Sequence, residues 1–143
     1  MNAEILQPLT VLAGWTMVMW VWMYAVRIPA MGKLTIDTSD FVKQTPVRMD
    51  DVMPAKAQWK AHNYNHLHEA PTVFYAVALA LAFMGGGNGA MATVAWAYVG
   101  LRIAHSLVQA IFNHLMLRFG LFILSTLCLM CLVLNALQLA FKG

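Results

Sequence analysis

The chain has 143 residues, of which 61% are hydrophobic and only 10% are charged, and its formal net charge is +3. Soluble domains carry more charge, and nucleic-acid-binding proteins carry dense runs of lysine and arginine, so the chain fits neither class. The length accommodates one domain, residues 1–143. The composition predicts a small all-α protein that crosses the lipid bilayer several times.

Four segments are expected to cross the bilayer, at about residues 5–31, 55–84, 90–112 and 119–140, and the second is long enough only if it includes part of a polar stretch. The first segment carries no charge until Arg27, near its end. A loop of about residues 32–54 follows, with both charge signs and two prolines. The second segment is polar in its first half, and Pro71 is predicted to kink it. These segments predict an integral membrane four-helix bundle.

Lysine and arginine gather around the first loop, and this asymmetry predicts the orientation of the chain in the membrane. Arg118 marks the third loop, whereas the second loop, "GGGNG", carries no basic residue. The first and third loops are therefore expected in the cytoplasm, and both termini on the opposite side. The basic residues of the first loop and its flanks are Lys33, Lys43, Arg48, Lys56 and Lys60.

Polar side chains form two stripes when the second and third segments are placed on helices at about 100° per residue. The stretch "KAHNYNHLHEAP" lies in the second segment, where Lys60, Asn63, Tyr64 and His68 point away from the stripe. Both stripes are expected to face the interior of the bundle. The second segment contributes Gln58, His62, Asn65, His66 and Glu69, and the third contributes Arg102, His105, Ser106, Gln109 and Asn113.

Depth along the helices brings the two stripes together. Counted from the "GGGNG" turn, Glu69 lies roughly 24 Å along the second segment and Arg102 roughly 20 Å along the third. We therefore expect an ion pair between Glu69 and Arg102, which lowers the cost of placing Arg102 in the membrane. Arg27 and Arg118 lie near the same level and add positive charge, so the stripes predict a pocket for an anionic, water-soluble ligand. The alternative is that these residues only hydrogen-bond the helices together, which is the default expectation for Ser106 and Asn113.

A metal site is the less favoured interpretation of the same residues. His62, His66 and Glu69 have helical spacing, and His105 could approach them, so imidazole and carboxylate ligands for zinc or a redox metal are present. Asparagines dilute the cluster, however, and no H-E-x-x-H motif occurs. No residue is therefore assigned as a metal ligand.

The chain resembles the MAPEG family, the membrane-associated proteins in eicosanoid and glutathione metabolism, over nearly its whole length. The resemblance is sharpest in "KAHNYNHLHEAP" and in "RIAHSLVQAIFNHLMLR". It implies a homotrimer of four-helix subunits with glutathione bound between neighbouring subunits, near the cytoplasmic side. It also suggests a bacterial branch located in the inner membrane. The matching positions are Lys60, Ala61, His62, Asn65, Glu69 and Pro71 in the second helix, and Arg102, His105, Ser106 and Arg118 from the third helix onward.

The resemblance implies roles for the matching arginine, asparagine, glutamate and histidine positions. Glutathione is the expected co-substrate, and Arg118 is expected to stabilise its thiolate. Family enzymes often have a tyrosine next to the glutathione sulfur, and Gln109 occupies that position here. The predicted function is a glutathione-dependent transferase or peroxidase acting on lipophilic electrophiles. The alternative is a non-catalytic membrane protein that binds a thiol or anion or supports a membrane complex. The positions expected to hold glutathione are Arg27, His62, Asn65, Glu69, Arg102, His105 and Gln109.

Overall fold

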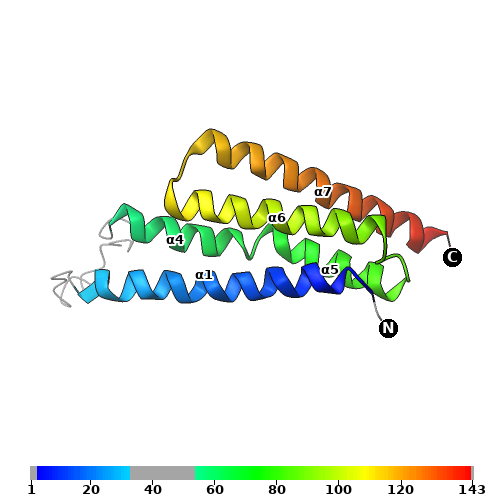
Figure 1. Cartoon of the computed structure of the whole chain (residues 1–143), viewed down its shortest axis with the longest axis horizontal. Helices are drawn as coiled ribbons and strands as arrows, with labels where there is room; N and C mark the ends of the chain where they lie inside the picture. Colours follow the sequence, from blue (N-terminus) through cyan, green and yellow to red (C-terminus); the bar gives the residue numbers. More distant parts are fainter. Residues whose placement is uncertain (1–2, 33–53, 143) are drawn as a thin grey trace, which may run out of the picture.

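The computed structural model describes residues 3–32 and 54–142. Most of the loop predicted at about residues 32–54, including Lys33, Lys43 and Arg48, lies outside the described residues. The described part is all-α, as predicted, and the helices form an elongated bundle (Figure 1). The helices are α1 (Leu6–Gly32), α4 (Ala55–His66), α5 (Ala70–Phe83), α6 (Ala90–Ile111) and α7 (Leu115–Phe141).

Helices α4 and α5 lie end to end and together run the length of the bundle, beside α1 and α6 (Figure 1). Helix α7 packs most extensively on α6 and also contacts α5, whereas α4 packs on α1 and α6. The chain therefore passes along the bundle four times, and the two ends of the chain lie at the same end of the molecule (Figure 1). This is the geometry that a four-span membrane protein requires.

Among the described residues, three helices are individually long and apolar enough to span a membrane, namely α1, α6 and α7. The predicted second span of residues 55–84 is divided between α4 and α5, with a turn at residues 67–69. Pro71 explains the break, because it has no N–H to donate and its ring clashes with the carbonyl of Leu67, four residues earlier. The predicted disturbance at Pro71 is confirmed, but it separates two helices rather than kinking one.

The start of α7 also differs from the prediction. It begins at Leu115, whereas the sequence predicted a connection up to Arg118 and a span from about residue 119. Asn113 has a positive φ of 49° and makes the turn between α6 and α7. Arg118 consequently lies in the first turn of α7, where the helix fixes its position relative to α6.

The bundle interior has an apolar half and a polar half. In the apolar half, which lies towards the termini, the rings of Phe74 and Tyr98 stack with their centroids 4.5 Å apart. In the other half α6 buries Arg102, His105, Ser106 and Gln109. The candidate site lies in this polar half.

The first residues of the described chain are tied to the turn between α5 and α6, which the sequence predicted at residues 85–89. The Ile5 N–H donates to the carbonyl of Gly87 at 2.9 Å. The Glu4 N–H donates to Asn88 Oδ1, and Glu4 Oε2 accepts from the Gly89 N–H, both at 2.9 Å. These bonds hold the start of α1 against the apolar half of the bundle.

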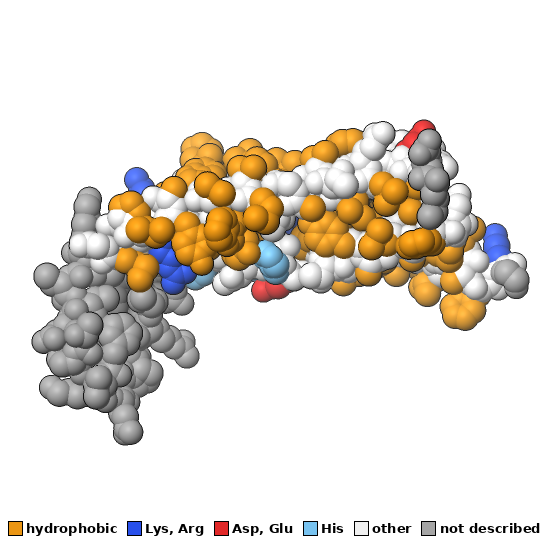
Figure 2. Space-filling model, turned by 90° about the horizontal axis from the view of Figure 1, so that it is seen from below, with side chains coloured by type: hydrophobic (Ala, Val, Ile, Leu, Met, Phe, Trp, Pro, Cys, Tyr) orange, Lys and Arg blue, Asp and Glu red, His pale blue; other side chains and the backbone are white. Residues whose placement is uncertain are grey.

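The outer surface is largely apolar. Figure 2 shows hydrophobic side chains along the whole bundle, with histidine and acidic side chains interrupting them midway along its length. Such large exposed side chains as Met17, Ile28 and Leu134 are typical of helices that face lipid or another subunit.

Candidate functional site

The polar face of α6 points into the bundle, as predicted. Arg102 is 3% exposed, His105 6%, Ser106 0% and Gln109 2%. Asn113, the last residue of the predicted stripe, lies beyond the helix end and is half-buried in the turn. The i, i+3, i+4 and i+7 spacing of the four buried residues explains their common direction.

The predicted inward face of α4 does not face the interior of the bundle formed by one chain. His62, Asn65 and Glu69 are exposed, and His66 lies half-exposed at the edge of the bundle interior. The face that packs on α1 and α6 instead contains Ala57, Lys60, Asn63 and Leu67. These residues follow helical spacing, with Ala57 and Leu67 as apolar anchors, and this was the signal that could have identified them.

A hydrogen-bonded network joins α1, α4 and α6 behind this face. Ser106 Oγ accepts from Asn63 Nδ2 at 2.7 Å and from Trp15 Nε1 at 3.1 Å. Lys60 Nζ donates to the carbonyl of Ala110 at 3.3 Å and lies 5.2 Å from the centre of the Trp22 ring. Ser106 therefore has the helix-joining function expected for polar residues in spans.

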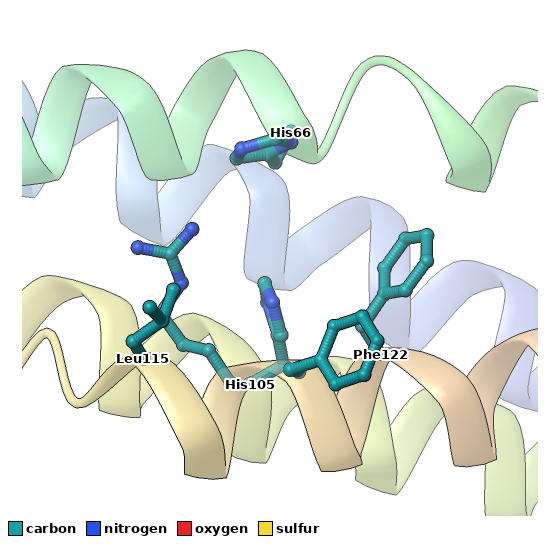
Figure 3. A pocket seen from close by; sticks show the side chains of 6 residues that line it. His66, His105, Leu115 and Phe122 are labelled. Carbon is teal, nitrogen blue, oxygen red and sulfur yellow. The ribbon is translucent and has the colours of Figure 1, made fainter.

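A cavity of about 120 Å³ lies where α4, α6 and α7 meet (Figure 3). The imidazole of His66 faces it from the end of α4, and that of His105 faces it from α6, with ring centroids 6.4 Å apart. The cavity is smaller than the roughly 300–1,000 Å³ of a site for a drug-sized ligand, so a tripeptide would extend beyond it. Its walls are His66, His105, Leu115, Arg118, Phe119 and Phe122.

Two guanidinium groups lie at this junction without an acidic partner. Arg118 Nη1 donates to Asn113 Oδ1 at 2.6 Å, while its buried Nε has no partner. Arg102 Nε donates to Tyr98 Oη at 3.2 Å, and its buried Nη2 has no partner. The Arg102 guanidinium also lies 5.4 Å from the ring of Phe122, which lines the cavity. Within residues 3–32 and 54–142 no carboxylate pairs with either arginine.

The expected ion pair between Glu69 and Arg102 is not formed within the subunit. Glu69 Oε2 instead lies 3.0 Å from Nδ1 of His66, and its side chain is 67% exposed. The depth count assumed one continuous helix, whereas the break at residues 67–69 turns the carboxylate towards the surface. Arg102 is left among the aromatic rings of Tyr98 and Phe122.

The other predicted ligand-binding residues lie apart from the cavity. Arg27 is half-buried on α1, and His62 and Asn65 are exposed on α4. Gln109 is buried on the same face of α6 as His105 but does not line the cavity, and its Oε1 has no hydrogen-bond partner. In the part of the chain that the structure describes, no three His, Cys, Asp or Glu side chains are placed to hold a metal ion.

The model of the MAPEG family matches residues 5–138, which is nearly the whole chain. No curated protein and no solved structure matches it.

Proposed function

Because the chain belongs to the MAPEG family, whose members are glutathione-related membrane enzymes, we propose that it binds glutathione and uses the thiol to conjugate or reduce lipophilic electrophiles. The protein is a multi-pass integral membrane protein.

The observation that carries the proposal is the pair of guanidinium groups with buried, unpartnered nitrogen atoms, Arg118 Nε and Arg102 Nη2. Buried positive charges are costly unless an anion or a set of hydrogen-bond acceptors compensates them. Glutathione supplies two carboxylates and an ionisable thiol. An anionic ligand in the cavity would place negative charge near both guanidinium groups, and the described residues offer no carboxylate that does so.

Arg118 is the residue proposed to act on the thiol. It lines the cavity, and a guanidinium remains protonated under all ordinary conditions. A fixed positive charge beside the sulfur favours the thiolate over the thiol, and the thiolate is the nucleophile. The rest of the tripeptide extends beyond the 120 Å³ cavity towards exposed polar residues, which include Asn65 on α4 and Glu69 on the turn after it.

The apolar walls of the cavity fit a lipophilic second substrate. Phe119 and Phe122 line it, and Leu115 and Phe119 are also exposed on the outer surface of α7. A substrate dissolved in the membrane can therefore approach the sulfur laterally between α4 and α7. No contact with the aqueous phase is needed on this route.

The proposed assembly is a homotrimer. His62 and Asn65 on α4 and Glu69 on the turn after it are exposed, although most of the side chains on the face shown in Figure 2 are apolar. Polar side chains on a membrane helix are stabilised by contact with another polar surface rather than with lipid. A neighbouring subunit would cover these residues and contribute to the glutathione site.

The experiment that tests the reaction uses the purified protein in liposomes with reduced glutathione and chlorodinitrobenzene. We expect conjugate to form at a rate that depends on both substrates, and we expect that rate to fall in the Arg118→Gln variant. Absence of conjugation and of peroxide reduction by the wild-type protein would contradict the catalytic proposal.

A second candidate function is non-catalytic binding of glutathione or another thiol. The position of Gln109 favours it, because this side chain does not line the cavity and cannot ionise near the sulfur. Thermal stabilisation by glutathione without turnover of either substrate would select this candidate.

A further inference from the structure

The cavity contains few groups that can receive a proton. Its polar walls are His66, His105 and Arg118, and its remaining walls are apolar. A guanidinium is always protonated and cannot accept a proton. A proton that leaves a ligand bound beside Arg118 must therefore pass to an imidazole or to water.

The two imidazoles have different electrostatic surroundings. His105 is 6% exposed and shares the buried face of α6 with Arg102, while Arg118 lies across the cavity. Among the described residues no carboxylate contacts it. Protonation of His105 would add a third positive charge to a buried cluster, which is unfavourable.

His66, by contrast, has a carboxylate partner. Its Nδ1 lies 3.0 Å from Oε2 of Glu69. When Nδ1 carries the proton and donates it to the carboxylate, the lone pair of the neutral ring lies on Nε2. A carboxylate in this position fixes the tautomer of the imidazole and stabilises the imidazolium that forms when Nε2 accepts a proton.

The break between α4 and α5 determines where this pair lies. His66 is the last residue of α4, and Glu69 is the N-cap residue of α5. Leu67 is buried and anchors the turn between them. Figure 3 shows the ribbon of α4 ending at His66, with the imidazole facing the cavity. Pro71 therefore contributes to the site, because it ends the first helix at this point.

We propose that His66, which Glu69 holds in position, is the proton acceptor that converts bound glutathione to its thiolate. This inference rests on the proposed function. The S–H bond breaks, the proton moves to Nε2 of His66, and the electron pair stays on the sulfur beside Arg118. In a conjugation the sulfur pair forms the new S–C bond, and the halide leaves with the electrons of the C–halogen bond. The imidazolium then releases its proton to water.

The charged and titratable groups that face His66 come from three segments. Glu69 lies on the turn after α4, His105 on α6 and Arg118 on α7. Glu69 places a negative charge beside the ring, and Arg118 places a positive charge across the cavity from it. Formation of the thiolate adds a negative charge next to Arg118, so the proposed proton transfer and the binding of the thiolate support each other.

The test compares His66→Gln, Glu69→Gln and His68→Gln in liposomes, with glutathione and chlorodinitrobenzene at neutral pH. Glutamine at position 66 keeps a polar side chain but cannot accept a proton, so kcat/KM should fall about 100-fold. The Glu69→Gln variant removes the charge alone and should lose about tenfold. His68 is the matched control, since it is exposed, bonds the carbonyl of Tyr64 and does not line the cavity.

Two further readouts separate proton transfer from ligand positioning. The activity of the His66→Gln variant should recover as the pH is raised, because hydroxide then ionises the thiol. S-methylglutathione has no thiol proton, so it should stabilise the variant and the wild-type protein to the same extent in thermal unfolding. The variant's folding is checked in the same measurement.

Each remaining outcome overturns a distinct claim. If His66→Gln binds S-methylglutathione and retains wild-type kcat/KM, His66 does not accept the proton. If the variant loses S-methylglutathione binding, His66 positions the ligand and the proton-transfer inference is wrong. If S-methylglutathione does not stabilise the wild-type protein either, the proposed glutathione site itself is wrong.

Discussion

At the scale of single residues, Ser106 joins three helices through one hydroxyl group. Its Oγ accepts from Asn63 on α4 and from Trp15 on α1. Arg102, one turn earlier, is held by Tyr98 and by aromatic rings instead of by a carboxylate. Two buried polar residues on the same face thus have different surroundings: Ser106 joins three helices by hydrogen bonds, and Arg102 lies among aromatic rings without a carboxylate partner.

The Ser106→Ala variant tests the stabilising function. Removing the hydroxyl leaves the Asn63 amide and the Trp15 indole N–H without their acceptor, which should cost about 1–3 kcal/mol of unfolding free energy. Ser125→Ala is the matched control, because Ser125 is equally buried but donates only to a carbonyl of its own helix, at Phe122. Unfolding in mixed detergent micelles measures both, and equal losses would show that the three-helix junction contributes nothing.

Glu69 does not form an ion pair with Arg102, and this gives a second prediction for single residues. Glu69→Gln should change the unfolding free energy by no more than about 0.5 kcal/mol, since the side chain is largely exposed and its only ion-pair partner in the described chain is His66. The same unfolding titration measures this. A loss of several kcal/mol would mean that the carboxylate compensates a buried arginine after all.

At the scale of helices, the start of α1 and the turn between α5 and α6 approach each other closely at Gly87. A Cβ atom added there would lie 2.6 Å from Ile5 Cγ2 and 3.3 Å from the backbone of Ala82. Ile5 is fully buried and β-branched, and it is fixed by its hydrogen bond to Gly87. Neither neighbour can move away without disturbing the contact between the two segments.

Gly87→Ala should therefore destabilise the protein by about 1–3 kcal/mol through overpacking. Gly100→Ala provides the control, because no atom lies within 4 Å of a Cβ at that exposed position inside α6. The control should be neutral or stabilising by up to about 1 kcal/mol, as alanine favours helix over glycine. Thermal unfolding in detergent compares them, and a stability of Gly87→Ala equal to that of Gly100→Ala would contradict the close approach.

The helices also show how far the sequence determines the site. The polar stripe of α6 was predicted because the rest of the helix is apolar. Its polar side chains find hydrogen-bond partners only if the stripe faces the interior of the bundle. Helix α4 is polar on several faces, and periodicity alone does not distinguish a face that packs within the subunit from one that faces outward. Asn63 and Lys60 face inward because Ser106 and the Ala110 carbonyl offer them partners, and those contacts are known only from the tertiary structure.

The sequence predicted a disturbance of the helix near Pro71, but not that the helix would end there and turn Glu69 outward. Pro71 indicated the disturbance, yet whether a proline bends a helix or ends it depends on what satisfies the freed carbonyl groups. Here the chain forms a turn, and Glu69 moves from the expected interior to the surface beside His66. The ion pair with Arg102 was inferred from a straight helix and failed for this reason.

At the scale of the whole molecule, the apolar core and the cavity lie in different halves of the bundle. The apolar half around Phe74, Tyr98 and Leu132 fixes the helices, and the polar half holds two arginines and two histidines near one cavity. The cavity draws its walls from the second, third and fourth passes, so these three passes must pack together to form it. The orientation with both termini outside the cytoplasm stays a prediction from the basic residues of the first loop.

The proposed trimer makes a prediction at this scale. In mild detergent the protein mass, after subtraction of the detergent, should be three times the subunit mass of 15.9 kDa. Asn65→Arg, which places a large charge on the exposed face of α4, should shift the protein towards smaller species because the charge would be buried in the interface. Light scattering at several protein concentrations measures both, and a wild-type monomer at all concentrations would exclude the proposed interface.

The most direct test of the central claim, an anionic thiol ligand at Arg118, is a thermal titration with reduced glutathione. The wild-type protein should gain stability with rising glutathione concentration, because the ligand binds the folded state. Arg118→Gln should lose most of this gain, whereas Lys142→Gln, which removes one positive charge at the far end of α7, should retain it. A wild-type unfolding temperature that does not change up to millimolar glutathione, or an equal gain in Arg118→Gln, would contradict the account.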